Sequence, residues 1–221
     1  DQVTDHYNVG SINLALEVTE RINRGEFTWE DDFKDVHPSP FGQSIYYRSV
    51  KAFLDDGYSE PLNRNEQITP HQIPGAIDPF CYDRGEIIPF TEASDIKGFE
   101  LHPNWSPAGS YGTRKGYTEV DMLIGEHAGD SFSFRFEGRA VGIMVAAGPD
   151  AGMIEYSIDG GETQKADLFT RWSRQLYLPW YLTLAAELDR GPHSLELKIS
   201  GDTNPDSTGH SCIITPFYIK N

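Results

Sequence analysis

Histidine and carboxylate side chains lie close together in residues 31–43, just before a predicted helix. An imidazole can take up and return a proton near neutral pH, and a carboxylate that accepts a bond from it fixes its tautomer. His37 follows Asp35 by two residues and Asp32 by five. The run therefore offers a general base with two candidate carboxylates to orient it. The same spacing is also compatible with a surface histidine in a helix-start loop.

The helix that would position His37 is expected to begin at Ser39 and Pro40. A serine side chain can accept a bond from a free backbone N–H at a helix start, and proline suits the first helical position. Gly57 provides a C-terminal stop. Apolar residues recur at near-helical spacing between these ends, which predicts one buried face: Phe41, Ile45, Val50, Phe53 and Leu54.

The run Asp-Val-His-Pro-Ser-Pro-Phe-Gly-Gln, followed by Ser-Ile-Tyr-Tyr-Arg-Ser-Val, resembles the last sequence block of the SGNH (GDSL-type) hydrolases. In that family a Ser-His-Asp triad cleaves esters, often acetyl esters on carbohydrate, and this block supplies the aspartate and the histidine. The resemblance implies that His37 is the general base. The family places its aspartate three residues before the histidine, where this chain has Lys34. Asp35 is then the first candidate for the orienting carboxylate and Asp32 the second.

The resemblance also implies a fold class for residues 1–57, namely an α/β fragment at the end of a flavodoxin-like hydrolase domain. It would comprise a buried parallel strand at residues 8–14, a helix ending at Gly25, the histidine loop and the last helix. The family's nucleophile and oxyanion-hole blocks come earlier in the fold, and 57 residues are too few for a doubly wound sheet. We therefore expect the chain to be the C-terminal part of a larger hydrolase, whose N-terminal remainder supplies the serine.

The letters of the family's nucleophile motif, Gly129-Asp130-Ser131, occur after the histidine rather than before it. It runs into an alternating apolar segment, which is typical of a strand and not of the helix that follows the family's serine. We expect a turn that opens a strand, and no nucleophile at Ser131.

Residues 58–107 are predicted to be an extended, ordered connector. Prolines recur so often that no long helix fits, whereas isoleucines throughout the segment need burial. Residues 87–90 are a candidate edge strand.

Residues 108–221 are predicted to form an antiparallel β-sandwich. Phe132, Phe134 and Phe136 alternate with polar residues, and Asp159-Gly160 is a hairpin signal. The segments Phe-Glu-Gly-Arg-Ala-Val-Gly-Ile, Glu-Tyr-Ser-Ile-Asp-Gly and Gly-Pro-His-Ser-Leu-Glu-Leu-Lys-Ile resemble the jelly-roll accessory domains of carbohydrate esterases in the same family.

Four aromatic residues, Trp172, Tyr177, Trp180 and Tyr181, fall within ten positions. Aromatic faces can stack on sugar rings, so Trp172, Trp180 and Tyr181 are candidate binding residues. The alternative is that these side chains fill the core or the interface with the hydrolase domain, as large aromatics commonly do.

The net charge of −16, with 34 acidic and 18 basic residues, argues against nucleic-acid binding and against adhesion to anionic lipid. No apolar run approaches the ~20 residues of a membrane span. The expected partners are an acylated carbohydrate substrate and the N-terminal remainder of the hydrolase, with no nucleic acid and no membrane. The expected location is secreted or periplasmic.

Five histidines are scattered without metal-ligand spacing, so we expect no metal and no cofactor; they are His6, His71, His102, His127 and His210. His193 follows a Gly-Pro turn and is expected to pack or cap. Cys81 and Cys212 could form one long-range disulfide or be two buried free thiols.

Two hypotheses about function follow from the sequence. In the first, the chain is the C-terminal portion of a serine esterase and contributes His37 and its carboxylate. In the second, it is a non-catalytic β-sandwich that binds carbohydrate or another partner and retains a remnant of an enzyme.

Overall fold

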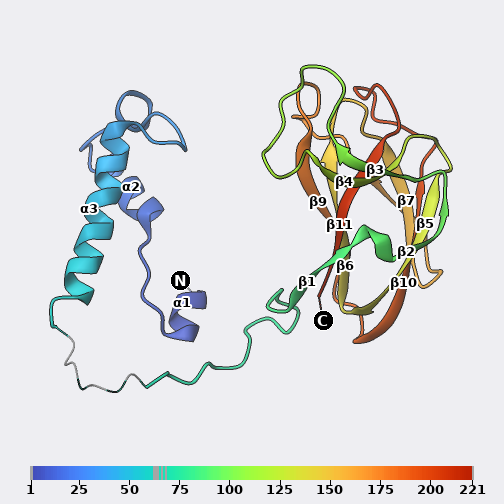
Figure 1. Cartoon of the computed structure of the whole chain (residues 1–221). Coiled ribbons are helices and arrows are strands. Elements are labelled where there is room, and N and C mark those ends of the chain that lie inside the picture. The colour runs from blue at the N-terminus through green and yellow to red at the C-terminus, as the bar shows by residue number, and fades with distance from the viewer. Residues whose placement is uncertain (1, 62–64, 66, 68, 221) are drawn as a thin grey trace. The chain divides into compact units, whose positions relative to one another are not determined.

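The computed structural model describes residues 2–61, 65, 67 and 69–220. The chain forms two compact units, Asp1–Pro79 and Phe80–Asn221. The first is helical and the second is built of strands (Figure 1).

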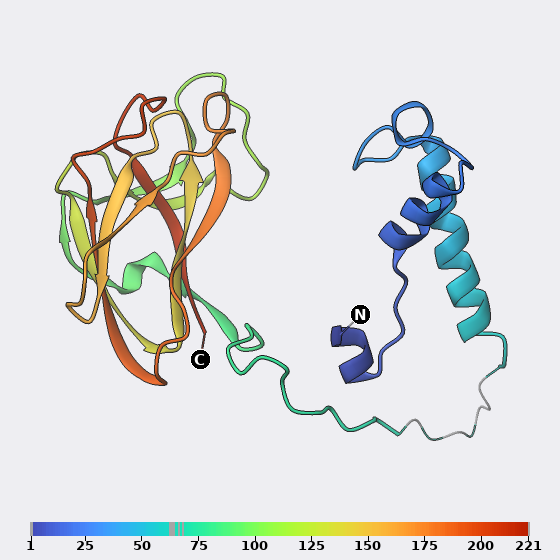
Figure 2. The same cartoon turned by 180° about the vertical axis from the view of Figure 1, so that it is seen from behind.

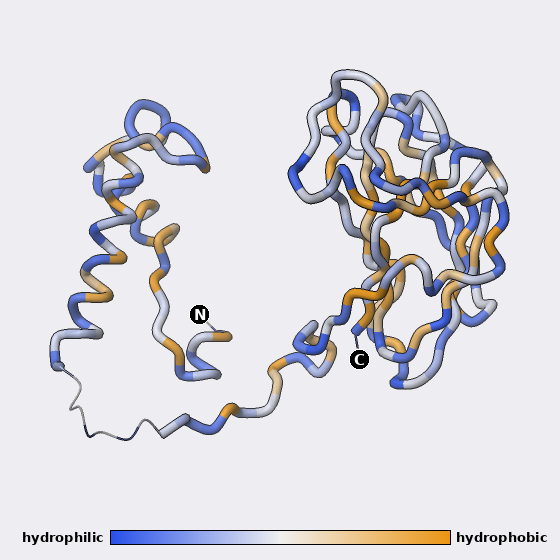
Figure 3. Tube along the Cα trace, viewed as in Figure 1, coloured by the Kyte–Doolittle hydropathy of each residue, from blue (hydrophilic) through white to orange (hydrophobic). Residues whose placement is uncertain are grey.

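Among the described residues, the helical unit has three α-helices and one short π-helical turn, η1. Their bounds are α1 (Gln2–Tyr7), α2 (Leu14–Asn23), η1 (Trp29–Phe33) and α3 (Pro40–Gly57). A small apolar cluster lies between α2, η1 and α3, and its buried members are Val18, Phe27, Phe33 and Ile45. Apolar segments alternate with polar ones along α3 in Figure 3. The face expected to be buried is nevertheless mostly exposed, because the helical unit has little to cover it: Ile45 is buried, whereas Phe41, Val50, Phe53 and Leu54 are 39–46% exposed.

The parallel strand expected at residues 8–14 is wrong. Leu14 already belongs to α2, and the side chain of Asn13 accepts a bond from the Leu16 N–H at 2.9 Å, which caps that helix. Val9 is 48% exposed. A parallel strand needs neighbours that cover it, and no strand occurs among described residues 2–61. The α-helices of the expected α/β fragment are thus present in this stretch, whereas its strand is not.

The second unit is a two-layered β-sandwich, in agreement with the predicted class. Its strands are β1 (Gly85–Pro89), β2 (Ala93–Lys97), β3 (Glu100–Trp105), β4 (Val120–Gly125), β5 (Ser131–Gly138), β6 (Ala140–Ala147), β7 (Met153–Ile158), β8 (Gln164–Asp167), β9 (Leu178–Ala185), β10 (Gly191–Ile199) and β11 (Cys212–Lys220). A 3-10 turn, Phe90–Glu92, lies between β1 and β2.

The strands form two antiparallel sheets. One has the order β3-β4-β11-β6-β9, with β1 also pairing with β11, and the other has the order β2-β5-β10-β7-β8. The main core lies between them. Phe132, Phe134 and Phe136 point into it, as their alternation predicted, and Phe134 stacks on Phe217 with ring centroids 4.1 Å apart.

The sandwich begins earlier than the sequence suggested. Strand β1 overlaps residues 87–90, where an edge strand was expected, and among the described strands it pairs with β11 alone. Strands β2 and β3 fall in residues 58–107, where an extended connector was expected. Proline lacks an N–H and is confined to strand edges and bulges. Pro103 fits this rule, because it lies in edge strand β3 at a shift of register against β4. Pro103 therefore marked a sheet edge and not the absence of a strand, whereas Pro70, Pro74 and Pro79 lie in a stretch with no helix or strand.

Residues 69–84 contain no helix or strand, as Figure 2 shows in a view from behind. The isoleucines of residues 58–107 were expected to be buried, but Ile73 and Ile87 are 79% and 68% exposed, and Ile68 lies outside the described residues. Cys81 and Cys212 are both free thiols, and Cys212 is completely buried, which raises its pKa.

The predicted hairpin at Asp159 is confirmed. Asp159 and Gly160 both have positive φ, of 52° and 67°, and the Gly161 N–H donates to the Ile158 carbonyl at 2.9 Å. This backbone suits the tight connection between β7 and β8.

Candidate functional site

The loop that carries His37 is fixed by the start of α3. The Ser39 hydroxyl accepts a bond from the Gly42 N–H at 3.3 Å and donates to the Asp32 carbonyl at 2.5 Å. Pro40 is the first helical residue, and the Gln43 side-chain amide donates to the Pro38 carbonyl at 3.1 Å. The predicted helix start is confirmed, and the loop before it is held at both ends by hydrogen bonds.

Gly42 has a packing role in this loop. A Cβ atom at this position would lie 2.7 Å from Pro38 Cβ and 2.8 Å from a ring carbon of Phe33. Phe33 is 1% exposed and is one of the two phenylalanines in the helical unit's core. A glycine therefore allows Phe33 and Pro38 to pack directly on the first turn of α3. The role of Gly42 is invisible in the sequence, because Phe33 is nine positions away.

His37 is exposed at the tip of this loop, between exposed Val36 and half-buried Pro38. Asp35 is close to it, but the Asp35 Oδ1 atom accepts a bond from the backbone N–H of His37, at 3.1 Å, and not from the imidazole. Lys34 has φ +79°, an uncommon conformation outside glycine, and it ends η1 and turns the chain into the loop. The structure thus places Asp35 beside His37 and leaves the imidazole free to face another molecule.

Asp32, the second candidate carboxylate, is engaged elsewhere. Its Oδ2 atom accepts bonds from the Thr28 N–H at 2.8 Å and from the Thr28 hydroxyl at 3.4 Å. Thr28 in turn caps η1 through the Asp31 N–H at 3.1 Å. Asp32 therefore stabilises the turn that precedes the loop, and of the two carboxylates Asp35 is the one positioned at His37.

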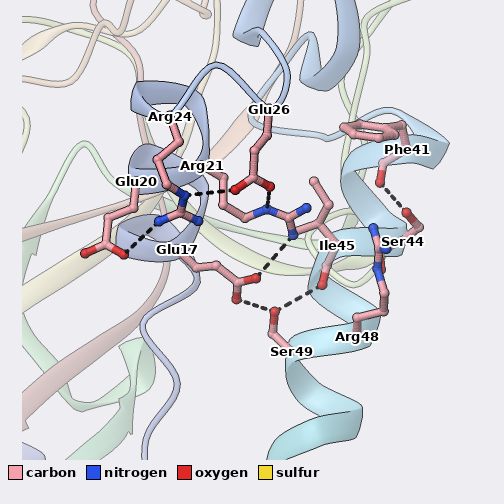
Figure 4. A network of polar contacts seen from close by, with 10 residues as sticks. All are labelled: Glu17, Glu20, Arg21, Arg24, Glu26, Phe41, Ser44, Ile45, Arg48 and Ser49. Carbon is pink, nitrogen blue, oxygen red and sulfur yellow. Dashed lines mark hydrogen bonds and ion pairs between the residues drawn. The ribbon is translucent and has the colours of Figure 1, made fainter.

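A network of charged side chains braces α2 against α3 (Figure 4). Arg21 bonds Glu26 at 2.7 Å and Glu17 at 3.5 Å, and Glu17 accepts a bond from the Ser49 hydroxyl on α3. The hydrogen bond from Arg21 lowers the pKa of Glu26, with a further contribution from Arg24, and raises the pKa of Arg21. This network holds the two helices together at the surface, where the apolar cluster is small.

The four clustered aromatic residues do not share one surface. Side chains alternate between the faces of a strand, so Trp180 and Tyr181 on β9 point to opposite sides of their sheet. Tyr181 is 73% exposed and Trp180 40%. Trp172 lies in the loop before β9, with the Arg171 guanidinium 4.5 Å from the ring centroid.

Tyr177, the fourth of these aromatics, is a packing residue. Its ring lies edge-on to Trp105 and Tyr111, with centroids 5.3 and 5.5 Å away. Burial raises its pKa, and the nearby Asp150 carboxylate adds to the shift. Packing thus accounts for Tyr177. Of the candidate binding residues, Trp180 and Tyr181 lie on opposite sides of their sheet, and Trp172 lies in the loop before β9.

His193 is a structural residue, in line with the expectation from sequence. Its Nδ1 lies 2.6 Å from Asp159 Oδ2 and its Nε2 lies 2.8 Å from the Asp189 carbonyl oxygen. The Asp159 bond is the main cause of a raised pKa at His193 and of a lowered pKa at Asp159. With both ring nitrogens engaged, His193 ties β10 to the β7–β8 turn.

Ser131 opens β5 directly after a turn, as predicted. The Asp130 carboxylate accepts bonds from the Glu126 and His127 N–H groups at 3.0 and 2.9 Å, and so stabilises the turn. The Gly129-Asp130-Ser131 letters therefore mark a turn and a strand start.

Within the part of the chain that the structure describes, no group of three or more His, Cys, Asp or Glu side chains is arranged to hold a metal ion. In the same residues, no helix is both long enough and apolar enough to cross a membrane.

Two solved structures are similar to this chain over its whole length. One is the crystal structure of a two-domain esterase active on acetylated mannans, with a TM-score of 0.71 and 14% identity, covering 100% of this chain and 58% of that chain. The other is such an esterase co-crystallized with mannopentaose, with a TM-score of 0.70 and 14% identity, covering 100% and 57%. The chain therefore shares a fold with somewhat more than half of that esterase. No protein-family model and no curated protein matches the sequence.

Proposed function

We propose that the chain is the C-terminal portion of a serine esterase of the SGNH type that removes acyl groups, acetyl in particular, from carbohydrate. The observation that carries this proposal is the exposed His37 imidazole, presented by a loop whose bracing residues, Ser39, Gly42 and Gln43, all belong to the SGNH-like sequence block. The fold shared with an esterase active on acetylated mannans supports it. An acylated polysaccharide as substrate also favours a secreted or periplasmic protein.

In the proposed reaction His37 is the general base. It takes the proton of a serine hydroxyl as the serine oxygen attacks the acyl carbonyl, and returns that proton to the sugar oxygen as the ester bond breaks. Water then releases the acyl group by the same steps. Ser39 is unsuited to the attack, because its hydroxyl donates to one backbone group and accepts from another. In the SGNH family the nucleophile block precedes the histidine block, and this chain covers 58% of the esterase whose fold it shares. We propose on these grounds that the nucleophile comes from a segment outside these 221 residues.

Asp35 is the proposed orienting carboxylate. It already lies at His37, where its Oδ1 atom accepts a bond from the His37 backbone N–H at 3.1 Å. Asp32 would have to give up its bonds to Thr28, which stabilise η1. The carboxylate stabilises the imidazolium that forms as the proton is transferred.

A second function, a non-catalytic carbohydrate-binding module, is favoured by a different observation. The sandwich exposes Trp172, Trp180 and Tyr181, and aromatic side chains can stack on sugar rings. In this alternative His37 is a surface residue, and Asp35 serves only to cap the loop.

The two functions are separated by ester hydrolysis in a protein that joins this chain to the hydrolase segment preceding it. On p-nitrophenyl acetate, His37→Ala should lower kcat by on the order of 10³-fold or more. His127→Ala is the matched control, because His127 is also exposed beside an aspartate, at 3.7 Å, and should leave the rate unchanged. Equal rates for wild type and His37→Ala would contradict the esterase proposal.

The same assay distinguishes the two carboxylates. Asp35→Asn should lower kcat strongly with no change in the amount of folded helix. Asp32→Asn should weaken η1 and alter the helical signal. The reverse pattern would assign the orienting role to Asp32.

A further inference from the structure

The outer face of the six-stranded sheet carries an aromatic groove of about 380 Å³. Its lining includes three tyrosines from three places in the chain: Tyr82 before β1, Tyr181 on β9 and Tyr218 on β11. Met144 on β6 and Ile87 on β1 complete its apolar surface. Outer faces of a β-sandwich are ordinarily polar, so this face requires an explanation.

The outer face of the other sheet follows the ordinary rule. There, Ser133, Glu196 and Ser157 lie in one row across β5, β10 and β7. In the next row Lys198 bonds Glu155 at 2.9 Å. The two outer faces of one sandwich therefore differ, and only the face that carries Tyr218 is aromatic.

The ring of Tyr218 lies across the sheet instead of standing away from it. Tyr218, Gly142 and Thr183 are direct neighbours in one row across β11, β6 and β9. A Cβ atom at Gly142 would lie 2.1 Å from Tyr218 Cζ, so the ring covers this glycine. At the far side of the row the Tyr218 hydroxyl lies 2.9 Å from the Thr183 hydroxyl. Glycine inside a strand often marks a close approach, and here it makes room for a ring fixed at both ends.

The side chains of Tyr82, Tyr181 and Tyr218 all line this groove, and the ring of Tyr218 forms its floor. Burial raises the pKa of Tyr218, and the nearby Tyr82 and Tyr181 raise it further. Tyr82 and Tyr181 are 55% and 73% exposed, so their rings stand at the rim and not in the core. The result is a fixed ring as floor, two exposed rings at the edges and hydroxyl groups between them.

This combination fits a sugar ring. A pyranose has a face of C–H groups, which packs on an aromatic ring, and a rim of hydroxyls, which exchange hydrogen bonds with phenol and threonine hydroxyls. The volume lies in the range of small-molecule sites. Glu86 is the one charged residue in the groove lining, and the chain carries a net charge of −16, which disfavours an anionic ligand.

We propose that this groove binds the pyranose rings of a neutral polysaccharide, with Tyr218 as the stacking platform and Tyr181 and Tyr82 as its walls. The inference rests on the proposed function in one respect, since it makes the sandwich the part that holds the polysaccharide. It assigns binding roles to Tyr82 and Tyr218, and it places Tyr181 in a groove that neither Trp172 nor Trp180 lines.

The test is calorimetric titration of the full chain with mannopentaose, with cellopentaose and with pentagalacturonate as an anionic comparison. We expect binding of a neutral pentasaccharide and none of the anionic one. Tyr181→Ala, which removes an exposed side chain, should weaken binding by about fivefold or more. Tyr218→Phe keeps the ring but loses the Thr183 bond, and should weaken it about two- to tenfold. Tyr47→Ala, at a tyrosine 65% exposed on α3, is the matched control and should bind as wild type does.

Three results would overturn the inference. If a neutral sugar binds but Tyr181→Ala and Tyr218→Phe bind it as tightly as wild type, the groove is not its site, and the proposed esterase function is untouched. If neither neutral pentasaccharide binds, the groove is not a site for such sugars, whereas the esterase function still depends on the His37 assay. If sedimentation shows a dimer that Tyr181→Ala dissociates, with no sugar bound, the groove is an interface between two copies.

Discussion

The helical unit and the sandwich differ in how many apolar side chains they bury. The main core of the sandwich contains twenty-one buried residues, whereas four make up the buried cluster described in the helical unit. Surface ion pairs and helix caps support the smaller cluster. The sandwich therefore contributes most of the folding free energy of the chain. The geometry of the His37 loop depends instead on a few local contacts.

The two units also differ in what they expose. The helical unit presents a polar group, the His37 imidazole, and apolar positions along α3, including Val50, Phe53 and Leu54 at 39–46% exposure. The sandwich exposes aromatic rings, of which Tyr82 and Tyr181 line one groove. In the proposed division of labour the helical unit contributes to bond cleavage and the sandwich to holding the polysaccharide.

The largest contrast is expected between two phenylalanines that are each 1% exposed, Phe134 in the sandwich and Phe33 in the helical unit. Phe134→Ala should lower the free energy of unfolding of the main thermal transition by about 3–5 kcal/mol. Phe33→Ala should leave that transition in place and reduce the helical circular dichroism signal. Equal shifts of the main transition in the two variants would show that the two units unfold together.

Two glycines of α3 give the next contrast. Gly42→Ala places a methyl group 2.7 Å from Pro38 and 2.8 Å from Phe33, and should destabilise the helical unit by about 1–3 kcal/mol. Gly57→Ala meets no atom within 4 Å and should be neutral or slightly stabilising. Hydrogen exchange of residues 40–57 measures both. Similar protection in the two variants would contradict the packing role of Gly42.

The His193–Asp159 pair predicts a pH-dependent contribution to the stability of the sandwich. The raised pKa of His193 gives stability that is fully present below the unfolded value, about 6.5, and is lost as pH rises through the folded pKa. The lowered pKa of Asp159 gives stability that is present above the unfolded value, about 3.9, and is lost as pH falls through the folded pKa. The pair therefore contributes most between these two unfolded values.

Thermal melts of wild type and His193→Gln, taken from pH 3 to 9, measure this contribution. The difference should be greatest near pH 5–6 and no more than about 1 kcal/mol, because Asp159 is partly exposed and its charge is screened. The charged residues Arg135, Glu137 and Asp189 also lie at this site, and they are present in both wild type and variant. A difference that is constant across the range would contradict an ionic pair.

The smallest effect is expected for the exposed ion pairs of the helical unit. Arg24 bonds Glu26 at 2.9 Å, but its side chain is 57% exposed. Arg24→Ala should lower helical content slightly in dilute buffer, and the difference from wild type should vanish in 0.5 M salt as screening removes the attraction. Arg21→Met should retain a difference in high salt, because the guanidinium also lies 5.5 Å from the Phe27 ring centroid. Identical salt dependence of both variants would contradict this ranking.

Local patterns predicted local structure well. The Ser39-Pro40 helix start, the alternating phenylalanines of β5 and the Asp159-Gly160 turn all follow from neighbouring residues, and all are confirmed. Non-local pairing was not predictable in this way. β1 pairs with β11, the last of the described strands. The residues around β1 carry no pattern that predicts a partner so distant in the sequence.

The candidate site shows the same difference between local and non-local features. The presentation of His37 before a helix followed from the sequence, because the capping residues are adjacent to it. The engagement of Asp32 with Thr28 did not, since either carboxylate was compatible with the spacing. The groove was missed because Tyr82 and Tyr218 are 136 positions apart and meet only through strand pairing. Gly142 between two apolar neighbours in β6 was the one available signal.

One measurement tests the proposed division of labour directly: hydrolysis of p-nitrophenyl acetate and of acetylated mannan by a protein that joins this chain to the proposed hydrolase segment. We predict that His37→Ala loses activity on both substrates, by on the order of 10³-fold or more. Tyr181→Ala should lose activity on the polysaccharide alone, by about fivefold or more. Full activity of His37→Ala on the small ester would contradict the account, because no exposed imidazole at this loop would then be needed for bond cleavage.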